Sequence, residues 1–140
     1  MAKGEFVFKT KLPIDKNIAW NFFNDINNLV RIIAFPKITI ILYEGVKKGS
    51  KTELDLNFYL FKTKWLLTYV EVDKGHYFID KSTSLPFPFK SWEHTHSFEE
   101  EDGKVTIMTD KVRFESYLPG FITKIGLYLG SFRKHCGFLT

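Results

Sequence analysis

Two histidines and two aspartates in the second half of the chain are the residues best suited to chemistry. His94 and His96 lie in a segment that reads Trp-Glu-His-Thr-His-Ser-Phe, where bulky and small polar side chains alternate with the period of a β-strand. Residues 106–114 alternate in the same way and place Asp110 on the inward face, while Asp80 belongs to an earlier strand-like segment. An inward carboxylate is costly without a partner. The pattern therefore predicts contact between the aspartates and the histidines.

The turn between the two histidine- and aspartate-bearing segments determines which residues face each other. A two-residue loop at residues 102–103 would bring a bulky face against a charged face, as any one-residue slip does. A three-residue loop at residues 101–103 keeps the bulky faces together. That register pairs Phe98 with Thr106, His96 with Met108, His94 with Asp110, and Trp92 with Val112. His94 is thus predicted to lie directly opposite Asp110.

A second register brings Asp80 to the other side of the same histidine. A loop over residues 85–90 sets Asp80 opposite His94, Phe78 opposite His96, and Ser82 opposite Trp92, unless its prolines insert a bulge. Together the two registers predict a buried row, Asp80–His94–Asp110. Burial lowers a histidine pKa and a nearby ionised carboxylate raises it. With two carboxylates, we expect His94 to be charged at neutral pH.

Three roles are open for these side chains. They could be a hydrogen-bonded anchor in the core, or a general acid–base site in which His94, Asp110 and Asp80 are the catalytic residues, because histidine titrates near neutral pH. They could also be a metal site, since His94 and His96 have acceptable spacing for two ligands and Asp110 or Asp80 could supply a third. The structural role is favoured over catalysis. No metal and no cofactor is predicted.

Composition excludes several other functions. The chain has 140 residues, the size of one domain (residues 1–140), and is 44% hydrophobic and 17% aromatic. Its net charge of +4 is mild and its lysines are scattered, so no nucleic-acid surface is predicted. There is no Gly-x-Ser-x-Gly motif and no glycine-rich phosphate loop.

The single cysteine, Cys136, excludes an internal disulfide and suits a reducing compartment. No signal-peptide pattern opens the chain and no apolar run is long enough for an integral membrane segment. We therefore expect a cytoplasmic protein that is a monomer or weak dimer.

Strand and helix patterns define how the rest of the chain positions these residues. A strand over residues 5–12 precedes two short helices capped by Asp15 and Asp25, the second stopped by Pro36. Further strands are predicted over residues 37–44, 51–61, 63–73 and 76–83, before the two described above. After Pro119 the spacing becomes helical. The prediction is an α+β fold in which a seven-stranded antiparallel sheet curls around a long C-terminal helix, residues 119–137.

The motif residues and this order of elements resemble the START/SRPBCC superfamily, the helix-grip (Bet v-like) fold of the birch-pollen allergens. Among its members, the chain is most similar to small prokaryotic proteins of the polyketide cyclase/dehydrase-like or coenzyme-Q-binding-like kind. The resemblance rests on Phe78, Asp80, Pro88-Phe89, Trp92, His94, His96, Phe98, Thr106, Asp110, Val112 and Pro119-Gly120.

The resemblance implies a carrier or sensor of a hydrophobic small molecule, such as a lipid, quinone or polyketide-like compound. The ligand would occupy a cavity of about 300–1,000 Å³ between the sheet and the C-terminal helix. The candidate ligand-binding residues are Leu56, Phe58, Trp92, His94, His96, Met108, Asp110 and Phe121. Two alternatives stay open, namely a cyclase- or dehydratase-type enzyme that uses His94 and Asp110, and a co-chaperone-like interaction protein.

Overall fold

The computed structural model describes residues 2–34 and 36–119. Strand β1 (Ala2–Leu12) is followed by helices α1 (Lys16–Phe23) and α2 (Ile26–Ile32). Six strands complete the described part: β2 (Lys37–Tyr43), β3 (Lys51–Asn57), β4 (Lys62–Asp73), β5 (Tyr77–Ser84), β6 (Phe89–Asp102) and β7 (Val105–Ser116). The predicted order of strands and short helices is confirmed. Beyond Pro119, the predicted terminal helix lies outside the described residues.

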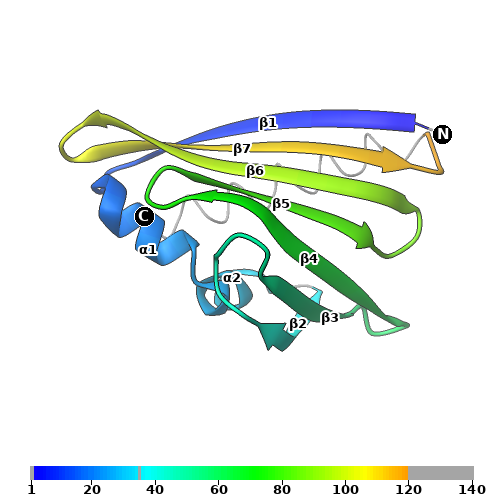
Figure 1. Cartoon of the computed structure of the whole chain (residues 1–140). Coiled ribbons are helices and arrows are strands. Elements are labelled where there is room, and N and C mark those ends of the chain that lie inside the picture. The colour runs from blue at the N-terminus through cyan, green and yellow to red at the C-terminus, as the bar shows by residue number, and fades with distance from the viewer. Residues whose placement is uncertain (1, 35, 120–140) are drawn as a thin grey trace.

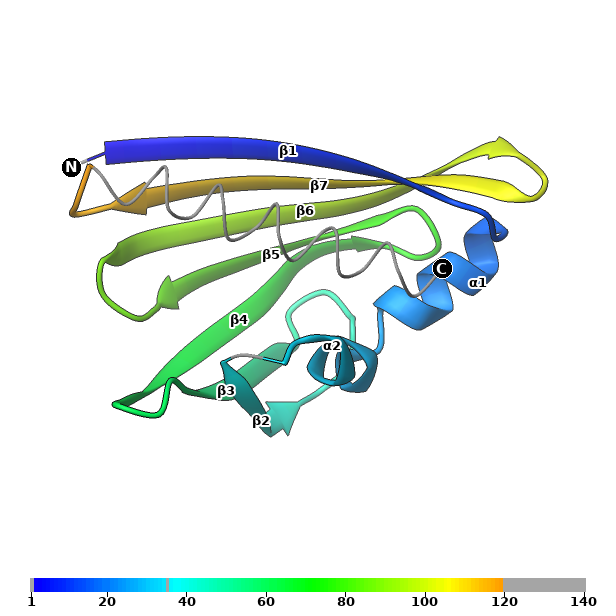
Figure 2. The same ribbon diagram turned by 180° about the vertical axis from the view of Figure 1, so that it is seen from behind.

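The seven strands form one antiparallel sheet in the order β1-β7-β6-β5-β4-β3-β2. The sheet twists strongly from β1 at one edge to β2 at the other, and both helices lie at the same end of it (Figure 1). The reverse view shows α2 beside β2 and β3, and α1 near the turn between β6 and β7 (Figure 2). Accordingly, α1 packs against β6 and β7, and α2 packs against β2.

Both short helices begin where the sequence predicts. The Asp15 carboxylate accepts a hydrogen bond from the Ile18 amide at 2.9 Å, and the Asp25 carboxylate accepts one from the Asn27 amide at 2.9 Å. Each cap satisfies one of the amides that the first helical turn leaves free. No helix in residues 2–34 or 36–119 is long and apolar enough to cross a lipid bilayer.

The strand predicted over residues 51–61 ends earlier, at Asn57. The Asn57 side chain accepts a hydrogen bond from the Tyr59 amide at 2.9 Å, and Tyr59 has a φ of 71°. The Phe58 amide donates to the Phe61 carbonyl at 3.0 Å, closing a tight turn. Side-chain alternation continues through this turn, which explains why the sequence pattern overran the strand.

One face of the sheet carries the apolar core. Its main buried cluster joins the sheet to α1 through Leu12, Ala19, Trp20, Tyr69, Phe78, Phe98 and Met108. The opposite face is polar and carries ion pairs between neighbouring strands, including Lys81 with Glu93 at 3.3 Å and Arg113 with Glu5 at 3.2 Å. The helices therefore cover the apolar face, and the ion pairs lie on the solvated face.

Candidate functional site

The pairing of β5 with β6 agrees with the predicted register. Asp80 lies opposite His94, Phe78 opposite His96, and Ser82 opposite Trp92. The prolines of the connecting loop therefore leave the register unchanged over these residues. This pairing brings one carboxylate of the predicted row to its histidine.

The pairing of β6 with β7 differs from the prediction by two residues. His96 lies opposite Asp110, and His94 lies opposite Val112. The turn is at residues 103–104, where the Asp102 carboxylate accepts from the Lys104 amide at 3.0 Å, and a bulge interrupts β6 between Glu100 and Asp102. A two-residue turn alone would put the wrong faces together, and the extra residue of the bulge restores the inward face.

The row Asp80–His94–Asp110 nevertheless forms. His94 Nδ1 lies 3.1 Å from Asp80 Oδ2, and His94 Nε2 lies 2.7 Å from Asp110 Oδ1. The contact with Asp110 runs diagonally across the strand pair instead of straight across it, within reach of a long side chain. The predicted row is thus confirmed, although the register from which it was derived is wrong.

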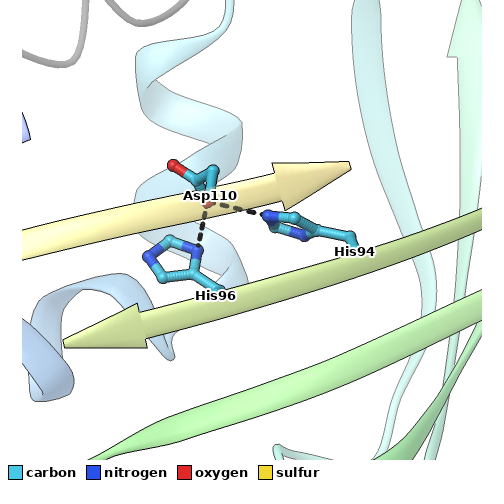
Figure 3. A group of neighbouring side chains, drawn as sticks. All are labelled: His94, His96 and Asp110. Atoms are coloured by element: carbon cyan, nitrogen blue, oxygen red, sulfur yellow. Dashed lines mark hydrogen bonds and ion pairs between the residues drawn. The ribbon is translucent and has the colours of Figure 1, made fainter. Parts of the chain in front are cut away.

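His96 is the residue that the predicted row left out. Its Nδ1 atom lies 2.9 Å from Asp110 Oδ1, the same oxygen that His94 contacts. Figure 3 shows both rings directed at Asp110 from neighbouring positions on one strand. Only the bulge near the β6–β7 turn places His96 opposite this carboxylate. The acidic run that holds the bulge, residues 99–102, has no alternation from which its position could be found.

The hydrogen bonds define the charge of His94. Ionised carboxylates only accept hydrogen bonds, so a ring held between two of them donates from both nitrogens and is an imidazolium. Burial by itself lowers the pKa of His94, but the charge of Asp80 and the hydrogen bonds that the ring donates to both carboxylates raise that pKa to about 10. His94 is therefore charged at neutral pH, as predicted.

Asp110 shows the complementary effect. Burial alone would raise the pKa of its carboxyl, but the charge of His96 and the hydrogen bonds from His94 and His96 hold that pKa well below its usual range. Burial, followed by the charge of Asp80, raises the pKa of the nearby Tyr69 hydroxyl, so Tyr69 stays protonated. The row is thus a network of fixed charges inside the protein.

A cavity of about 270 Å³ lies beside this row, between the sheet and the two helices. Its volume is slightly below the predicted range. Asp80, His94, His96 and Asp110 form its polar wall. The remaining wall is mostly apolar and includes Phe8, Phe22, Phe23, Ile26, Leu29, Ile32, Ile33, Pro36, Ile38, Leu54, Leu56, Trp65, Leu67, Tyr69, Phe78, Trp92, Met108 and Val112.

Most of the predicted ligand-binding residues line this cavity, namely Leu56, Trp92, His94, His96, Met108 and Asp110. Phe58 is elsewhere: its ring stacks on Phe61 at 4.9 Å in the turn after β3, because the strand ends before it. Phe121 lies outside the described residues. The contribution of α2 to the wall was not predicted, although the apolar spacing of Leu29, Ile32 and Ile33 was a signal for it.

Residues of the polar wall could also be considered as ligands of a metal ion. His94, His96 and Asp110 each offer a possible ligand atom within 4.8 Å of the others. A metal needs a deprotonated ring nitrogen. Both nitrogens of His94 are instead committed to carboxylates, so a metal would have to replace its bond to Asp110. The observed arrangement is that of a hydrogen-bonded row.

No protein-family model and no curated protein sequence matches the chain. Solved structures match its fold. Ara h 8.0201 superposes with a TM-score of 0.72 at 14% identity, covering 98% of this chain and 97% of that one. Norcoclaurine synthase from Thalictrum flavum gives 0.69 at 13% identity, with 99% and 86% covered. The Zhui aromatase/cyclase from Streptomyces sp. R1128 gives 0.65 at 11% identity, with 84% and 70% covered.

These neighbours share one architecture. Together with the seven-stranded antiparallel sheet and the two short helices after β1, they show that the described part of the chain has the same Bet v-like fold as these proteins. The fold that the motif residues predicted is therefore confirmed for the sheet and the two short helices. Similarity at these identities defines the fold alone, so function has to be argued from the site.

Proposed function

We propose that this protein binds a hydrophobic small molecule in the cavity and serves as its carrier or sensor. The expected ligand classes are lipids, quinones and polyketide-like compounds. The observation that carries this proposal is the cavity itself: about 270 Å³ of space remains between the sheet and the helices, with a mostly apolar wall, the polar row on the sheet, and Asn24 and Asn28 on the helix side. Small-molecule sites commonly combine a largely apolar wall with a few convergent polar groups.

The structural neighbours support this proposal. One norcoclaurine synthase structure holds dopamine and hydroxybenzaldehyde, and Zhui is an aromatase/cyclase. The shared fold makes a ligand-sized interior a reasonable expectation for the present chain, whose own cavity provides the direct support.

The state of His94 favours binding over a cyclase- or dehydratase-type reaction that uses the His94 and Asp110 pair. A general base needs a free lone pair on the nitrogen that takes the proton. Both nitrogens of His94 lie within hydrogen-bond distance of carboxylates that only accept. While the row is intact, His94 has no lone pair to offer, so its role is to hold the polar wall in place.

Native mass spectrometry of the purified protein tests the proposal. We expect a second species, heavier than the bare chain by the mass of one small molecule, which solvent extraction releases for identification. Protein that carries no such species should then be titrated with the fluorescent apolar probe N-phenyl-1-naphthylamine. Saturable binding with one site per chain is expected.

Two neighbouring positions on β4 provide a matched pair of variants. Leu67 lines the cavity, whereas Leu66 is exposed on the sheet. Leu67→Trp should fill part of the space and weaken probe binding by at least about tenfold, while Leu66→Trp should leave it unchanged. Equal binding by both variants, or no binding by the parent protein, would contradict the proposed function.

A further inference from the structure

Two buried ring nitrogens of cavity-lining residues, Trp65 Nε1 and His96 Nε2, have no hydrogen-bond partner among the described residues. His96 is buried, and its Nε2 atom makes no hydrogen bond within residues 2–34 and 36–119. Its other ring nitrogen, Nδ1, lies 2.9 Å from Asp110 Oδ1. Buried polar atoms are nearly always paired, and an unpaired one costs free energy unless something else satisfies it.

The surrounding rings fix the direction of this atom. The His96 ring stacks on Phe98 with centroids 4.8 Å apart and on Phe78 with centroids 5.2 Å apart, both at 25° between planes. Phe23 of α1 adds a third ring at 5.8 Å. With Nδ1 bonded to Asp110 and the faces covered by aromatic rings, the imidazole cannot turn without losing these contacts. Nε2 is therefore held in a fixed direction at the cavity wall, with its hydrogen-bonding capacity unused within the described residues.

The proton on Nδ1 limits what Nε2 can do. Because Asp110 only accepts, Nδ1 carries a proton, and Nε2 of a neutral ring then presents a lone pair. If the ring is charged, Nε2 carries a proton and donates it. A hydroxyl group can pair with either form, since it both donates and accepts. A carbonyl or ether oxygen can pair only with the charged form, and a hydrocarbon with neither.

We propose that His96 Nε2 is the specificity-determining contact of the cavity, and that it selects apolar molecules carrying a hydroxyl group. This inference rests on the proposed binding function and narrows its ligand class. Asp110 acts as a positioning residue, because its Oδ1 atom holds the ring through Nδ1 while accepting from His94 on its other side. Phe23 and Phe78, the rings beside His96 that line the cavity, receive the apolar body of the ligand.

Two probes of nearly equal shape test this selection. Naphthalene and 2-naphthol differ only by one hydroxyl group, and their dissociation constants can be measured by fluorescence titration of the full chain. For the parent protein and for a His96→Phe variant, the dissociation constant of naphthalene is divided by that of 2-naphthol. Phenylalanine keeps the ring stacking and removes the nitrogen. We expect this ratio to be about tenfold lower in the variant, because one net hydrogen bond to 2-naphthol is lost.

A second lining residue supplies the control. Leu67→Ala removes apolar wall without touching the polar row, so it should weaken both probes by the same factor and leave their ratio unchanged. A measurement on the parent protein avoids any folding defect of the His96 variant. In the ¹⁵N spectrum of the histidine rings, 2-naphthol should move the Nε2 resonance of His96, and naphthalene should leave it in place.

The outcomes separate the two proposals. If both probes bind but His96→Phe leaves their ratio unchanged and Nε2 does not respond to 2-naphthol, the selection by His96 is wrong while the binding function stands. If neither probe binds the parent protein, both are overturned. A ratio that shifts together with a specific Nε2 response supports the assignment.

Discussion

At the scale of single residues, one carboxylate oxygen organises the site. Asp110 Oδ1 lies 2.7 Å from His94 Nε2 and 2.9 Å from His96 Nδ1, so the same acceptor orients two imidazoles. Asp80 holds the far side of His94. Each buried carboxylate thus has a partner, which offsets the cost of removing its charge from water.

Removing the central imidazole should be strongly destabilising. His94→Ala leaves two buried carboxylates without their shared cation, and breaking a buried ion pair in this way costs roughly 3–5 kcal/mol. Urea denaturation of parent and variant at pH 6 measures the difference. His76→Ala, at an exposed histidine, is the matched control and should change the free energy of unfolding by less than about 0.5 kcal/mol. A His94→Ala variant as stable as the parent would show that the row contributes nothing to stability.

The row should also make stability depend on pH. The pKa of His94 is raised from 6.5 to about 10, so its contribution is fully present below pH 6.5 and is lost as pH rises toward 10. The pKa of Asp110 is lowered from 3.8, so its contribution is present above that value and is lost as pH falls below it. The contribution should therefore be greatest between these two ordinary values.

Urea denaturation over a pH series checks this dependence. The parent protein should lose stability steadily from pH 6.5 to pH 10, and His94→Ala should lose much less over the same interval. Parallel curves for the two proteins would mean that His94 keeps its ordinary pKa in the folded state.

The residue-scale prediction from sequence was partly successful for a physical reason. An inward aspartate has to find a cation or donor, and histidines are the basic side chains on the inward face of the neighbouring strand, so the members of the row were predictable. The contact of His96 with Asp110 was not, because it depends on a shift of two residues along β7. The alternation of side chains shows which face of the sheet each one occupies. It does not reveal a shift of the strand register by an even number of residues, because such a shift leaves every side chain on the same face.

At the scale of elements, the β6–β7 hairpin and the edge strand β1 position the site. The bulge between Glu100 and Asp102 decides the register, and it lies in a run of acidic residues that alternation cannot resolve. The helix starts were easier to predict, since Asp15 and Asp25 are both followed by apolar helical spacing. The start of a helix could therefore be predicted because a single capping residue determines it.

A close approach on β1 gives a prediction at this scale. Gly4 lies opposite Phe114, and a Cβ added at Gly4 would meet the Phe114 ring at 2.6 Å. Phe114 is buried between the rings of Phe6 and Phe89, at 5.7 and 5.6 Å, so it has little room to move. Gly4→Ala should therefore destabilise the protein by about 1–3 kcal/mol, the usual cost of overpacking.

Denaturation in urea measures this cost, and a second substitution identifies its cause. In a Phe114→Leu background, Gly4→Ala should cost less, because the ring that it strikes has gone. Lys3→Ala, on the exposed face of the same strand, should have little effect. An equal cost of Gly4→Ala in both backgrounds would mean that Phe114 is not the source of strain.

At the scale of the whole molecule, the space between the sheet and the helices is what distinguishes this fold from a filled core. Sequence predicted the seven-stranded antiparallel sheet and the two short helices, because alternation, turn residues and caps all point to the same elements. It predicted the cavity wall only in part. Leu29 of α2 and Pro36 in the segment after it also line the wall. The apolar spacing in α2 indicates a buried face, but it does not tell which part of the sheet that face covers.

A cavity that binds a ligand should couple binding to stability. A ligand that binds only the folded state stabilises it by about 2.7 kcal/mol at a hundred times its dissociation constant. We therefore expect N-phenyl-1-naphthylamine to raise the melting temperature of the parent protein, with the rise increasing with probe concentration. Leu67→Trp should show a smaller rise and Leu66→Trp an unchanged one. A melting temperature that stays unchanged at a saturating concentration of the probe would contradict binding inside the folded domain.

The two edges of the open sheet affect how copies of this chain interact at high concentration. β1 and β2 are the outermost strands, and within the described residues neither pairs with a further strand on its outer side. Such an edge is a template on which another chain can add a strand. β1 exposes Lys3, Lys9 and Lys11, and a second copy aligned there would bring its own lysines close to them. We therefore expect these charges to oppose the addition of a further strand at β1, a property that the cavity and its polar row do not provide.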